Sequence, residues 1–561
     1  MYTSDSVIVV GAGLGGFSAA ITAAALGAQV TLLERGARFG GAAAFSGGQV
    51  WVGANHVAAA LGSTDTVEET LRYIAELARK EPSLFEAERA AEWVVAAHQA
   101  VQWFAGQGVI EWSVIPDYPD YYFPDTDGSR AWGRYLTGAP FDGARLGAWR
   151  KDLLEGPHFP VGITYAEMFE FGGMSQRSEF AALRAQRRQA DVMTYGQGII
   201  AAFASAAMRL GVDLRLCTEV TGLVQRKGRV VGVRSAGPDG PDKLGGTVIL
   251  ATGSHDWSPD ISRRVTGLDP EDSGSVAPPT LHGDHFSFAD DVGAQVRSIP
   301  AWAAPVLPGY RLLQPAFDGD TGFRPCFEHC VPHTFIVNRT GQRFCDDSFH
   351  PAIVAAALGE AADGSGDVRR PNVPMYMIWD EQHHRKYGLG SSLPGADYPQ
   401  GLVTRASSLE ELAAALGINA TGLADTARRF NAHAAKDEDP AFGRGSNASV
   451  RRFRGDNNAP HPNIAPVAEP PFFGMRLRLL NTGIASGGLR TTDHGRVLAY
   501  DGSVIVGLYA VGECAVRSTG GGGYNSGYSL SRAMTFGWLA ANDIHVGSAT
   551  PGTRERGGRD A

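Results

Sequence analysis

The stretch Val7-Ile8-Val9-Val10-Gly11-Ala12-Gly13-Leu14-Gly15-Gly16, followed along the chain by Glu34, decides the fold of this protein. Its four apolar residues predict a buried strand, and its glycines fall where that strand turns into an Ala-rich helix over Phe17–Leu26. Val30–Leu33 predicts a second strand, with Glu34 at its end. A glycine-rich turn between strand and helix, with an acid after the next strand, is the fingerprint of dinucleotide binding in a parallel α/β sheet.

Each residue of this motif has a separate physical role. Gly11 permits the tight turn, Gly13 lets a pyrophosphate approach the backbone, and Gly16 lets the helix pack closely on the strand. The helix N-terminus offers free N–H groups to a phosphate, and Glu34 can accept hydrogen bonds from a ribose. The alternative is a glycine-rich turn in an unrelated α/β protein.

Length, composition and charge limit the classes of protein to which the chain can belong. With 561 residues the chain is too long for one compact core, so we expect two or more domains. A net charge of −9 gives no reason to expect a nucleic-acid partner. We expect no transmembrane segment, because no apolar run reaches about 18 residues. The N-terminus enters the first strand without a secretory signal, so we expect a cytoplasmic protein.

The cysteines do not predict a disulfide framework or a metal centre. They contain no C-x-x-C pair, which fits a reducing compartment. Cys326 and Cys330 lie near His329 and His333, and a metal site there is one interpretation. Scattered thiols and loop histidines are the interpretation that we prefer, so no metal ligand is predicted.

Small residues also dominate the stretch from Gly40 to Gly48, which precedes Gln49-Val50-Trp51. A backbone with such small side chains can lie close to a flat or extended group. The ribityl chain and isoalloxazine ring of FAD are the natural candidates, since a nicotinamide enzyme would not need this segment here. An ordinary glycine-rich loop is the alternative.

The motif Ser46-Gly47-Gly48-x-x-Trp51, followed by the segment Asp65–Tyr73, resembles the flavoprotein family of 3-ketosteroid dehydrogenases. That family belongs to the wider fumarate-reductase-like FAD superfamily. Thr247–Ser254, Gly502–Glu513 and the segment Tyr524–Leu530 carry the resemblance further, so that it covers about residues 5–545.

The resemblance implies an α/β fold, in which a Rossmann-like FAD-binding domain of the glutathione-reductase type carries an inserted α+β substrate and catalytic domain. We expect the FAD-binding domain over residues 1–289, the inserted domain over 290–467, a return to the FAD-binding domain over 468–548, and a flexible tail over 549–561. The two prolines at residues 278–279 favour a boundary between domains there.

The fingerprint and the resemblance together predict the residues that contact FAD. We expect the cofactor to be bound non-covalently, because no histidine lies between Gly36 and Gly48, where the succinate-oxidising relatives attach it. The predicted contacts are Gly11, Gly13, Leu14, Gly15, Gly16, Glu34, Arg35, Gly40, Gly41, Ala42, Ser46, Gly47, Gly48, Val220, Ala251, Thr252, Gly253, Asp284, Gly512, Glu513, Ser529 and Leu530.

The resemblance implies oxidation of a carbon–carbon single bond next to a ketone. Such a site must polarise the carbonyl and remove a weakly acidic α-proton, and tyrosine suits both tasks. We predict that Tyr524, or a backbone N–H around Gly527, holds the carbonyl oxygen. Tyr121 and Tyr195 are the candidates for moving the proton, with Tyr118 and Tyr122 left open as neighbours of Tyr121. The alternative for Tyr121 is a surface aromatic cluster. The alternative for Tyr195 is simple packing before a helix.

Two departures from the steroid enzymes bear on the substrate. The stretch Arg343–His350 has no tyrosine where those enzymes commonly place one, so a pocket base is missing or is replaced by His350. The loop Tyr524–Tyr528 is about one residue shorter than in the 1-dehydrogenases. A pocket narrowed around a single ring would suit a cyclohexanone-type ketone, and we place that slightly ahead of a 3-ketosteroid 1- or 4-dehydrogenase. The tryptophans that could narrow it are Trp112, Trp132, Trp149 and Trp302.

Other functions are weaker interpretations of the same residues. The predicted insert lacks an obvious Arg/His cluster for a dicarboxylate, which disfavours a fumarate-reductase-like ene reductase. A non-catalytic flavin carrier would need no tyrosines near the flavin. No nicotinamide site is evident beside that for FAD, so we expect a quinone or another non-nicotinamide electron acceptor.

Overall fold

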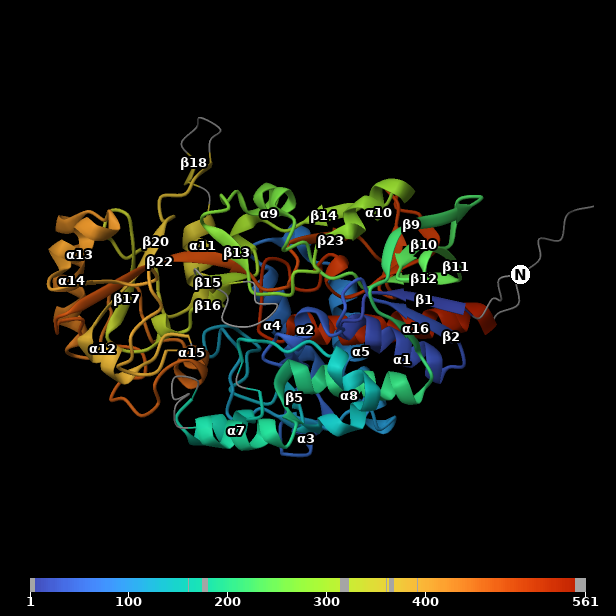
Figure 1. The fold of residues 1–561 in the computed structure, drawn as a ribbon, viewed down its shortest axis with the longest axis horizontal. Helices are drawn as coiled ribbons and strands as arrows, with labels where there is room; N and C mark the ends of the chain where they lie inside the picture. The colour runs from blue at the N-terminus through green and yellow to red at the C-terminus, as the bar shows by residue number, and fades with distance from the viewer. Residues whose placement is uncertain are drawn as a thin grey trace, which may run out of the picture.

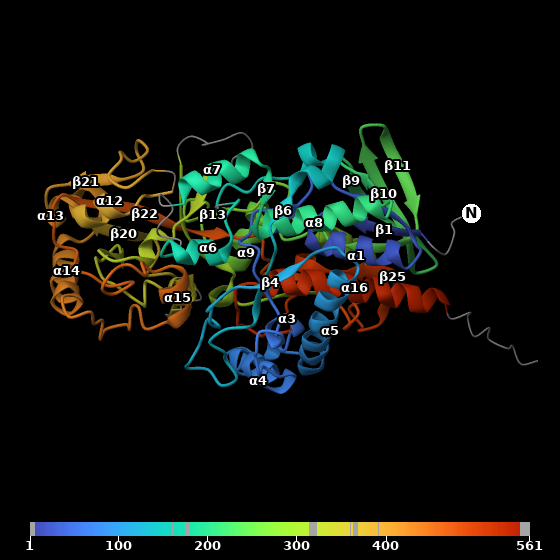
Figure 2. The same ribbon diagram turned by 90° about the horizontal axis from the view of Figure 1, so that it is seen from below.

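The computed structural model describes residues 6–549, apart from residues 160, 174–179, 313–321, 360, 363–367 and 391. The predicted tail therefore lies almost wholly outside the described residues. Figures 1 and 2 show two groups of elements. Yellow and orange elements from the middle of the chain gather at one end, while blue β1 and red α16 lie together at the other. No helix among the described residues is both long and apolar enough to cross a bilayer.

A six-stranded sheet forms the core of the first group. Its central strand β1 (Ser6–Val10) pairs in parallel with β12 and β2, with Val7 opposite Thr247 and Val30. The prediction of an α/β fold around this strand is confirmed, and burial of both sheet faces explains its continuous run of apolar residues. The strand order is β24 (Arg496–Leu498), β25 (Val504–Ala510), β12 (Thr247–Leu250), β1, β2 (Gln29–Leu33) and β8 (Asp213–Arg215).

Helix α1 (Leu14–Ala25) leaves β1 through the glycine turn and is buried along most of its length. It lies beside α16 (Tyr528–Ala549), although the two come from opposite ends of the chain (Figure 1). A Cβ at Gly537 would lie 2.6 Å from the carbonyl oxygen of Gly15, so glycine permits this close approach. The other elements of this group are α2 (Gly41–Ala44), α8 (Tyr195–Arg209), β9 (Glu219–Arg226), β10 (Arg229–Gly237), β11 (Gly240–Gly245), α10 (Asp284–Val292), β14 (Val296–Ser298) and β23 (Gly487–Leu489).

A second sheet organises the other end of the molecule, with β22 (Phe472–Asn481) near its centre. Strand β13 (Ser273–Ser275) pairs with β22, and both lie outside the predicted insert of residues 290–467. The domain bounds given by the sequence stay a prediction. The sheet also contains β15 (Val306–Arg311), β16 (Phe323–Pro325), β17 (Thr334–Asn338), β20 (Met375–Asp380) and β21 (Thr404–Ala406).

Helices lie around this second sheet, and α3 (His56–Ala59), α4 (Val67–Ala78) and α5 (Ala87–Gly106) lie beneath α1 and α16 in the view of Figure 2. Around the second sheet are α9 (Pro259–Thr266), α11 (His350–Leu358), β18 (Ala361–Ala362), β19 (Val368–Arg369), α12 (Glu381–Lys386), α13 (Leu409–Leu416), α14 (Ala420–Ala434) and α15 (Ala448–Phe453). The remaining elements are β3 (Val50–Trp51), β4 (Trp112–Val114), β5 (Tyr135–Gly138), β6 (Phe141–Asp142), α6 (Tyr165–Glu170), α7 (Ala181–Gln189) and β7 (Val192–Met193).

Candidate functional site

A cavity of about 530 Å³ runs from the carboxyl ends of β1, β2 and β12 to the start of α11 in the second group. Crevices outside the carboxyl ends of strands are where open α/β sheets bind ligands. One end of the cavity, here called the cofactor end, is lined by the glycine turn and Glu34. The other, here called the reactive end, is lined by Tyr121, His350, Arg454 and Tyr524.

The three fingerprint glycines play different roles at the cofactor end. A Cβ at Gly11 would lie 2.3 Å from the carbonyl oxygen of Ala251, and one at Gly16 would lie 1.9 Å from that of Gly11. These two glycines therefore permit close packing of strand, turn and helix. Gly13 precedes α1 and has no heavy atom within 4 Å of the position that its Cβ would take. That open space, beside the helix N-terminus, fits a pyrophosphate.

Glu34 and Arg35 form a polar wall farther along the cofactor end. Glu34 is buried and accepts hydrogen bonds from the N–H groups of Ala12 at 3.0 Å and Gly36 at 2.8 Å. Burial raises the pKa of Glu34, against the opposing effect of these hydrogen bonds. Arg35 forms ion pairs with Asp284, at 3.0 Å, and with Glu219. This arrangement fits a ribose next to the phosphate position.

Nearly all the residues predicted to contact the cofactor line this cavity. Gly16 and Gly40 do not, and both serve packing; a Cβ at Gly40 would lie 2.8 Å from that of Ala44. The lining residues among them are Gly11, Gly13, Leu14, Gly15, Glu34, Arg35, Gly41, Ala42, Ser46, Gly47, Gly48, Val220, Ala251, Thr252, Gly253, Asp284, Gly512, Glu513, Ser529 and Leu530.

Glu513 links the segment around Ala485 to the first turn of α16 through hydrogen bonds. Its carboxylate accepts a hydrogen bond from the Ser529 hydroxyl at 2.7 Å and one from the Ala485 N–H at 2.9 Å. Ser529, Leu530 and Ala533 of α16 line the cavity, so the N-terminus of this helix lies at its wall. A helix N-terminus stabilises negative charge that lies close to its free N–H groups.

Two tyrosines face each other at the reactive end. The ring centroids of Tyr121 and Tyr524 lie 6.4 Å apart, and the His350 ring lies 5.6 Å from that of Tyr121. Burial raises the pKa of Tyr121, while the charge of Arg454 and hydrogen bonds with Ser526 and Arg454 act in the opposite direction. Burial raises the pKa of Tyr524 strongly and lowers the pKa of His350 far below its ordinary value. Both Tyr524 and His350 are therefore neutral near pH 7.

Asparagine side chains hold the backbone of Tyr121 from two directions. Asn525 accepts the Tyr121 N–H at 3.0 Å, and Asn447 donates to the Tyr121 carbonyl oxygen at 2.6 Å. Asn525 is fully buried and also donates to the hydroxyls of Tyr73 at 2.9 Å and Tyr528 at 3.3 Å. Tyr121 is thus fixed between the returning FAD-domain segment and the second group of elements.

The residue before Tyr121 anchors the same loop. Asp120 is buried and accepts hydrogen bonds from the Trp51 indole at 2.7 Å and the Arg134 guanidinium at 2.9 Å. Arg134 also pairs with Asp65 at 2.7 Å, so one buried arginine joins two acids. A buried charge pair satisfied by several hydrogen bonds is rigid, and it fixes the direction in which the aromatic loop enters the cavity.

Gly527 also lines the cavity, with a left-handed backbone at φ +84°. A Cβ there would lie 2.7 Å from the Trp51 nitrogen, and the Gly527 carbonyl accepts the Trp51 N–H at 3.2 Å. Among the described residues the Gly527 N–H has no hydrogen-bond partner. It is therefore available to a ligand oxygen.

Tyr195 lies apart from the other predicted catalytic residues. It is the first residue of α8, with φ +55°, and its ring packs edge-on against Tyr165 at 4.8 Å. It is not among the lining residues of the main cavity and instead borders a separate hollow of about 160 Å³. A Cβ at Gly48 would lie 2.3 Å from the Tyr195 carbonyl carbon, so the Tyr195 backbone presses against a cavity-lining turn.

The tryptophans expected to narrow the pocket are mostly elsewhere. Trp302 lines the cavity, and its ring would lie 2.5 Å from a Cβ at Gly522. Trp112, Trp132 and Trp149 are not among the lining residues; Trp112 instead donates to the Val101 carbonyl oxygen at 3.2 Å in the core. Trp112 and Trp149 pack instead with the apolar core of the first group of elements.

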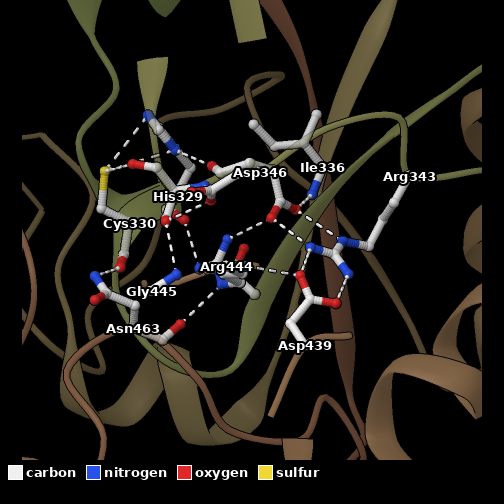
Figure 3. Close-up of polar contacts among 12 residues, drawn as sticks. His329, Cys330, Ile336, Arg343, Asp346, Asp439, Arg444, Gly445 and Asn463 are labelled. Atoms are coloured by element: carbon white, nitrogen blue, oxygen red, sulfur yellow. Dashed lines mark hydrogen bonds and ion pairs between the residues drawn. The ribbon is translucent and has the colours of Figure 1, made fainter. Parts of the chain in front are cut away.

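A buried charged cluster supports the wall that carries His350 (Figure 3). Asp347 accepts hydrogen bonds from Arg444 at 2.8 Å, Arg343 at 2.9 Å and the Ile336 N–H at 2.6 Å. Burial alone would raise its pKa, but the two guanidinium groups hold the pKa of Asp347 well below its ordinary value. Arg343 also pairs with Asp439 at 2.8 Å. The cluster fixes the segment that begins α11, whose first residues line the cavity.

The cysteines and histidines considered for a metal are used in this framework instead. His329 contacts the Asp347 carbonyl oxygen at 2.6 Å, and the Cys330 thiol donates to that of Ser348 at 3.2 Å. His333 contacts the Pro466 carbonyl oxygen at 2.8 Å, and the Cys326 thiol lies 3.6 Å from the Met377 sulfur. Within the described ranges no group of three or more His, Cys, Asp or Glu residues is placed to hold a metal ion.

Several residues of the reactive end were not found by sequence reasoning. Ser526 donates to Gln49, Arg454 borders Tyr121, and Asn447 and Asn525 hold the Tyr121 backbone. Asn525 and Ser526 lie inside the stretch that was singled out, so their type and position were a usable signal. Arg454 follows a short helix without any motif, and nothing in its local sequence points to a cavity.

Comparisons with known proteins agree with this geometry. A family described as FAD binding domain matches residues 6–531. The chain is 29% identical to 3-oxosteroid 1-dehydrogenase of Mycolicibacterium smegmatis, with 97% of each chain covered. It is 30% identical to 4-oxocyclohexanecarboxylate 2-dehydrogenase of Sinomonas cyclohexanicum, with 96% of this chain and 92% of the relative covered.

Solved structures extend the comparison. The 3-ketosteroid delta1-dehydrogenase from Sterolibacterium denitrificans, in complex with 1,4-androstadiene-3,17-dione, aligns with a TM-score of 0.85 and 25% identity, covering 97% of this chain and 100% of that one. A flavocytochrome c3 fumarate reductase aligns with a TM-score of 0.62 and 20% identity, covering 98% of this chain and 79% of that one, which shows a shared fold. The resemblance to this superfamily and the prediction of FAD are confirmed.

Proposed function

We propose, given that this chain belongs to the FAD binding domain family and is an FAD-dependent dehydrogenase, that it desaturates a cyclohexanone-type ring ketone to the enone. The α-carbon loses a proton to a tyrosine and the β-carbon loses a hydride, so the ring loses two hydrogens and gains a double bond. FAD, when bound, supplies the acceptor for that hydride at its N5.

The chain's own residues control the carbonyl and the proton. The Tyr524 hydroxyl and the Gly527 N–H donate to the ketone oxygen, where negative charge develops as the α-proton leaves. Tyr121 takes that proton as its phenolate, the form that the neighbouring Arg454 cation and Ser526 favour against the effect of burial, and becomes a neutral phenol. The cavity walls, more apolar than polar, position the ring against these groups.

The single observation that carries the proposal is the pair of cavity tyrosines with different surroundings. Burial raises the pKa of both, but for Tyr121 the Arg454 charge and hydrogen bonds with Ser526 and Arg454 oppose the rise, whereas for Tyr524 only the Arg517 charge does so. Two titratable groups whose environments differ in this way suit one base and one hydrogen-bond donor. We assign the base to Tyr121 rather than Tyr195, because Tyr195 does not line this cavity.

A 3-ketosteroid 1- or 4-dehydrogenase is the second candidate, and the close structural alignment with a steroid-bound enzyme favours it. The single-ring substrate is supported by His350, which lines the pocket in a stretch where the steroid enzymes commonly carry a tyrosine, and by Trp302 at the wall. We propose a quinone or another non-nicotinamide acceptor for reoxidation, since a second dinucleotide fingerprint is not evident in the sequence.

Anaerobic bleaching of the yellow protein tests the proposal. Cyclohexanone should bleach the flavin absorbance, and an androstane 3-ketone should do so far more slowly. Bleaching by the steroid and not by cyclohexanone would favour the second candidate. A flavin that stays oxidised with every enolisable ring ketone offered would contradict ketone desaturation altogether.

A further inference from the structure

We propose that Arg454 binds a carboxylate carried by the substrate ring, so that the ketone is an oxocycloalkane carboxylic acid rather than a neutral ring. This inference rests on the proposed function and deepens it by naming the substrate class. Three observations carry it: the position of Arg454 in the cavity, its lack of an acidic partner, and its place relative to the two tyrosines.

Arg454 lies at the end of α15, half-buried, with its side chain on the cavity wall. Its guanidinium carbon lies 3.8 Å from the centroid of the Phe327 ring and 5.2 Å from that of Phe453. Stacking on an aromatic face orients the guanidinium plane and leaves its N–H groups to donate along the edge. The Arg454 charge and a hydrogen bond with it act to lower the pKa of Tyr121, which places the guanidinium near that phenol. The remaining edge suits a planar carboxylate, which arginine can bind through two parallel hydrogen bonds.

No carboxylate among the described residues pairs with this cation. Within the part of the chain that the structure describes, Arg454 forms no ion pair. Neighbouring acids are engaged elsewhere: Glu328 accepts the N–H groups of Phe327 and Gly390, at 2.9 and 3.1 Å. Asp346 accepts the Ser348 hydroxyl at 2.6 Å, and Asp456 pairs with Lys386 at 2.7 Å. A cation drawn partly out of water without a counter-ion favours an anionic ligand.

The contrast with Arg35 strengthens the argument. Arg35 lines the cofactor end of the same cavity but is already paired with Asp284 and Glu219. Its charge is compensated by the protein, as befits a residue beside a bound dinucleotide. The Arg454 charge is left for whatever enters the reactive end.

The position of Arg454 also matches one ring. It lies near Tyr121, whereas the carbonyl donors are Tyr524 and Gly527, and the two tyrosine rings are 6.4 Å apart. A six-membered ring with its carboxylate opposite the ketone has its two polar groups at opposite ends. The ketone would then face Tyr524 while the acid faces Arg454, and the carbons next to the ketone would pass Tyr121.

A matched pair of substrates separates this role from any effect of Arg454 on Tyr121. 4-Oxocyclohexanecarboxylate and its methyl ester share the ring and the ketone but differ in charge. The rate of anaerobic flavin reduction is measured for both with the holoenzyme and with the Arg454→Gln, Arg454→Lys and Arg451→Gln variants. Arg451, on the exposed side of the same helix, is the control.

Arg454→Gln should lower kcat/KM for the acid about ten- to a hundredfold more than for the ester, the size expected of a charge-assisted hydrogen bond. Arg454→Lys should restore part of the preference for the acid, and Arg451→Gln should leave it unchanged. The dissociation constant of the unreactive cyclohexanecarboxylate, followed through the flavin spectrum, should rise in Arg454→Gln by a similar factor.

Equal losses for acid and ester would overturn the inference, since Arg454 would then act through Tyr121 alone, and would leave the proposed function standing. A wild-type enzyme that prefers the ester would also overturn the inference. Failure of both compounds, and of cyclohexanone, to reduce the flavin would instead reject the proposed function.

Discussion

The two ends of the cavity are built in different ways. At the cofactor end, one short stretch supplies strand, turn and helix, and Glu34 binds back to Ala12 and Gly36 within that same unit. At the reactive end, Tyr121 is held by Asn525 and Asn447, residues from two other parts of the chain. The difference teaches that the glycine turn is set by local backbone geometry, while the position of Tyr121 depends on packing between segments that are remote in the chain.

Replacement of Tyr121 by Phe should have the largest effect on the reactive end. Loss of a general base typically costs about 10²- to 10⁴-fold in rate, and flavin reduction by the ketone should slow accordingly while FAD stays bound. Stopped-flow absorbance measures the rate, and the flavin-to-protein ratio measures occupancy. Tyr118→Phe is the matched control, since Tyr118 is buried nearby but is not among the lining residues. A Tyr121→Phe variant with wild-type rates would show that Tyr121 is not the general base.

Replacement of Asp347 by Asn should lower the free energy of unfolding. Removing one partner from a buried ion pair costs about 3–5 kcal/mol, and Asp347 serves both Arg343 and Arg444. Chemical unfolding of the FAD-loaded protein should show the loss. An unchanged unfolding midpoint would mean that the cluster of Figure 3 does not support the reactive end.

The lowered pKa of Asp347 predicts that the stability of the protein depends on pH. The folded-state pKa of Asp347 is lowered, so its contribution to the free energy of unfolding is complete above the ordinary Asp value of about 4. That contribution is lost as pH falls from there through the folded-state pKa. Unfolding curves between neutral and acidic pH should therefore converge for wild type and Asp347→Asn; parallel curves would contradict the role of this charge.

Replacement of Glu34 by Gln should act on the cofactor end alone. Weakening of charge-assisted hydrogen bonds costs about 1.5 kcal/mol or more, so FAD affinity should fall roughly tenfold. With FAD added in excess, the rate of flavin reduction should match that of wild type. A rate defect that persists at saturating FAD would show that the two ends of the cavity are not independent.

Replacement of Tyr195 by Phe should have the smallest effect. Its hydroxyl lies 3.9 Å from the Met168 sulfur, away from the cavity lining, so the reduction rate should change less than about twofold, within the usual range for a residue outside the reacting groups. A loss as large as that expected for Tyr121→Phe would transfer the base to Tyr195 and reverse the comparison between the two tyrosines.

Sequence reasoning succeeded where function depends on neighbours in the chain. The strand before Gly11, the helix after it and the acid at the end of β2 were all foreseen. It could not place Trp112 and Trp149, because a tryptophan in a core and one at a pocket look alike in sequence. The pairing of β13 with β22, across about 200 residues, also leaves no local trace in the sequence.

The sequence by itself determined the strand, glycine turn and helix of β1 and α1, because a missing Cβ or the start of a helix is a property of single residues. Only the tertiary structure decided which tyrosines share a cavity and that Arg454, which has no ion pair among the described residues, lies beside one of them. Proximity in those cases arises from packing between segments that are remote in the chain, and no residue type encodes it alone.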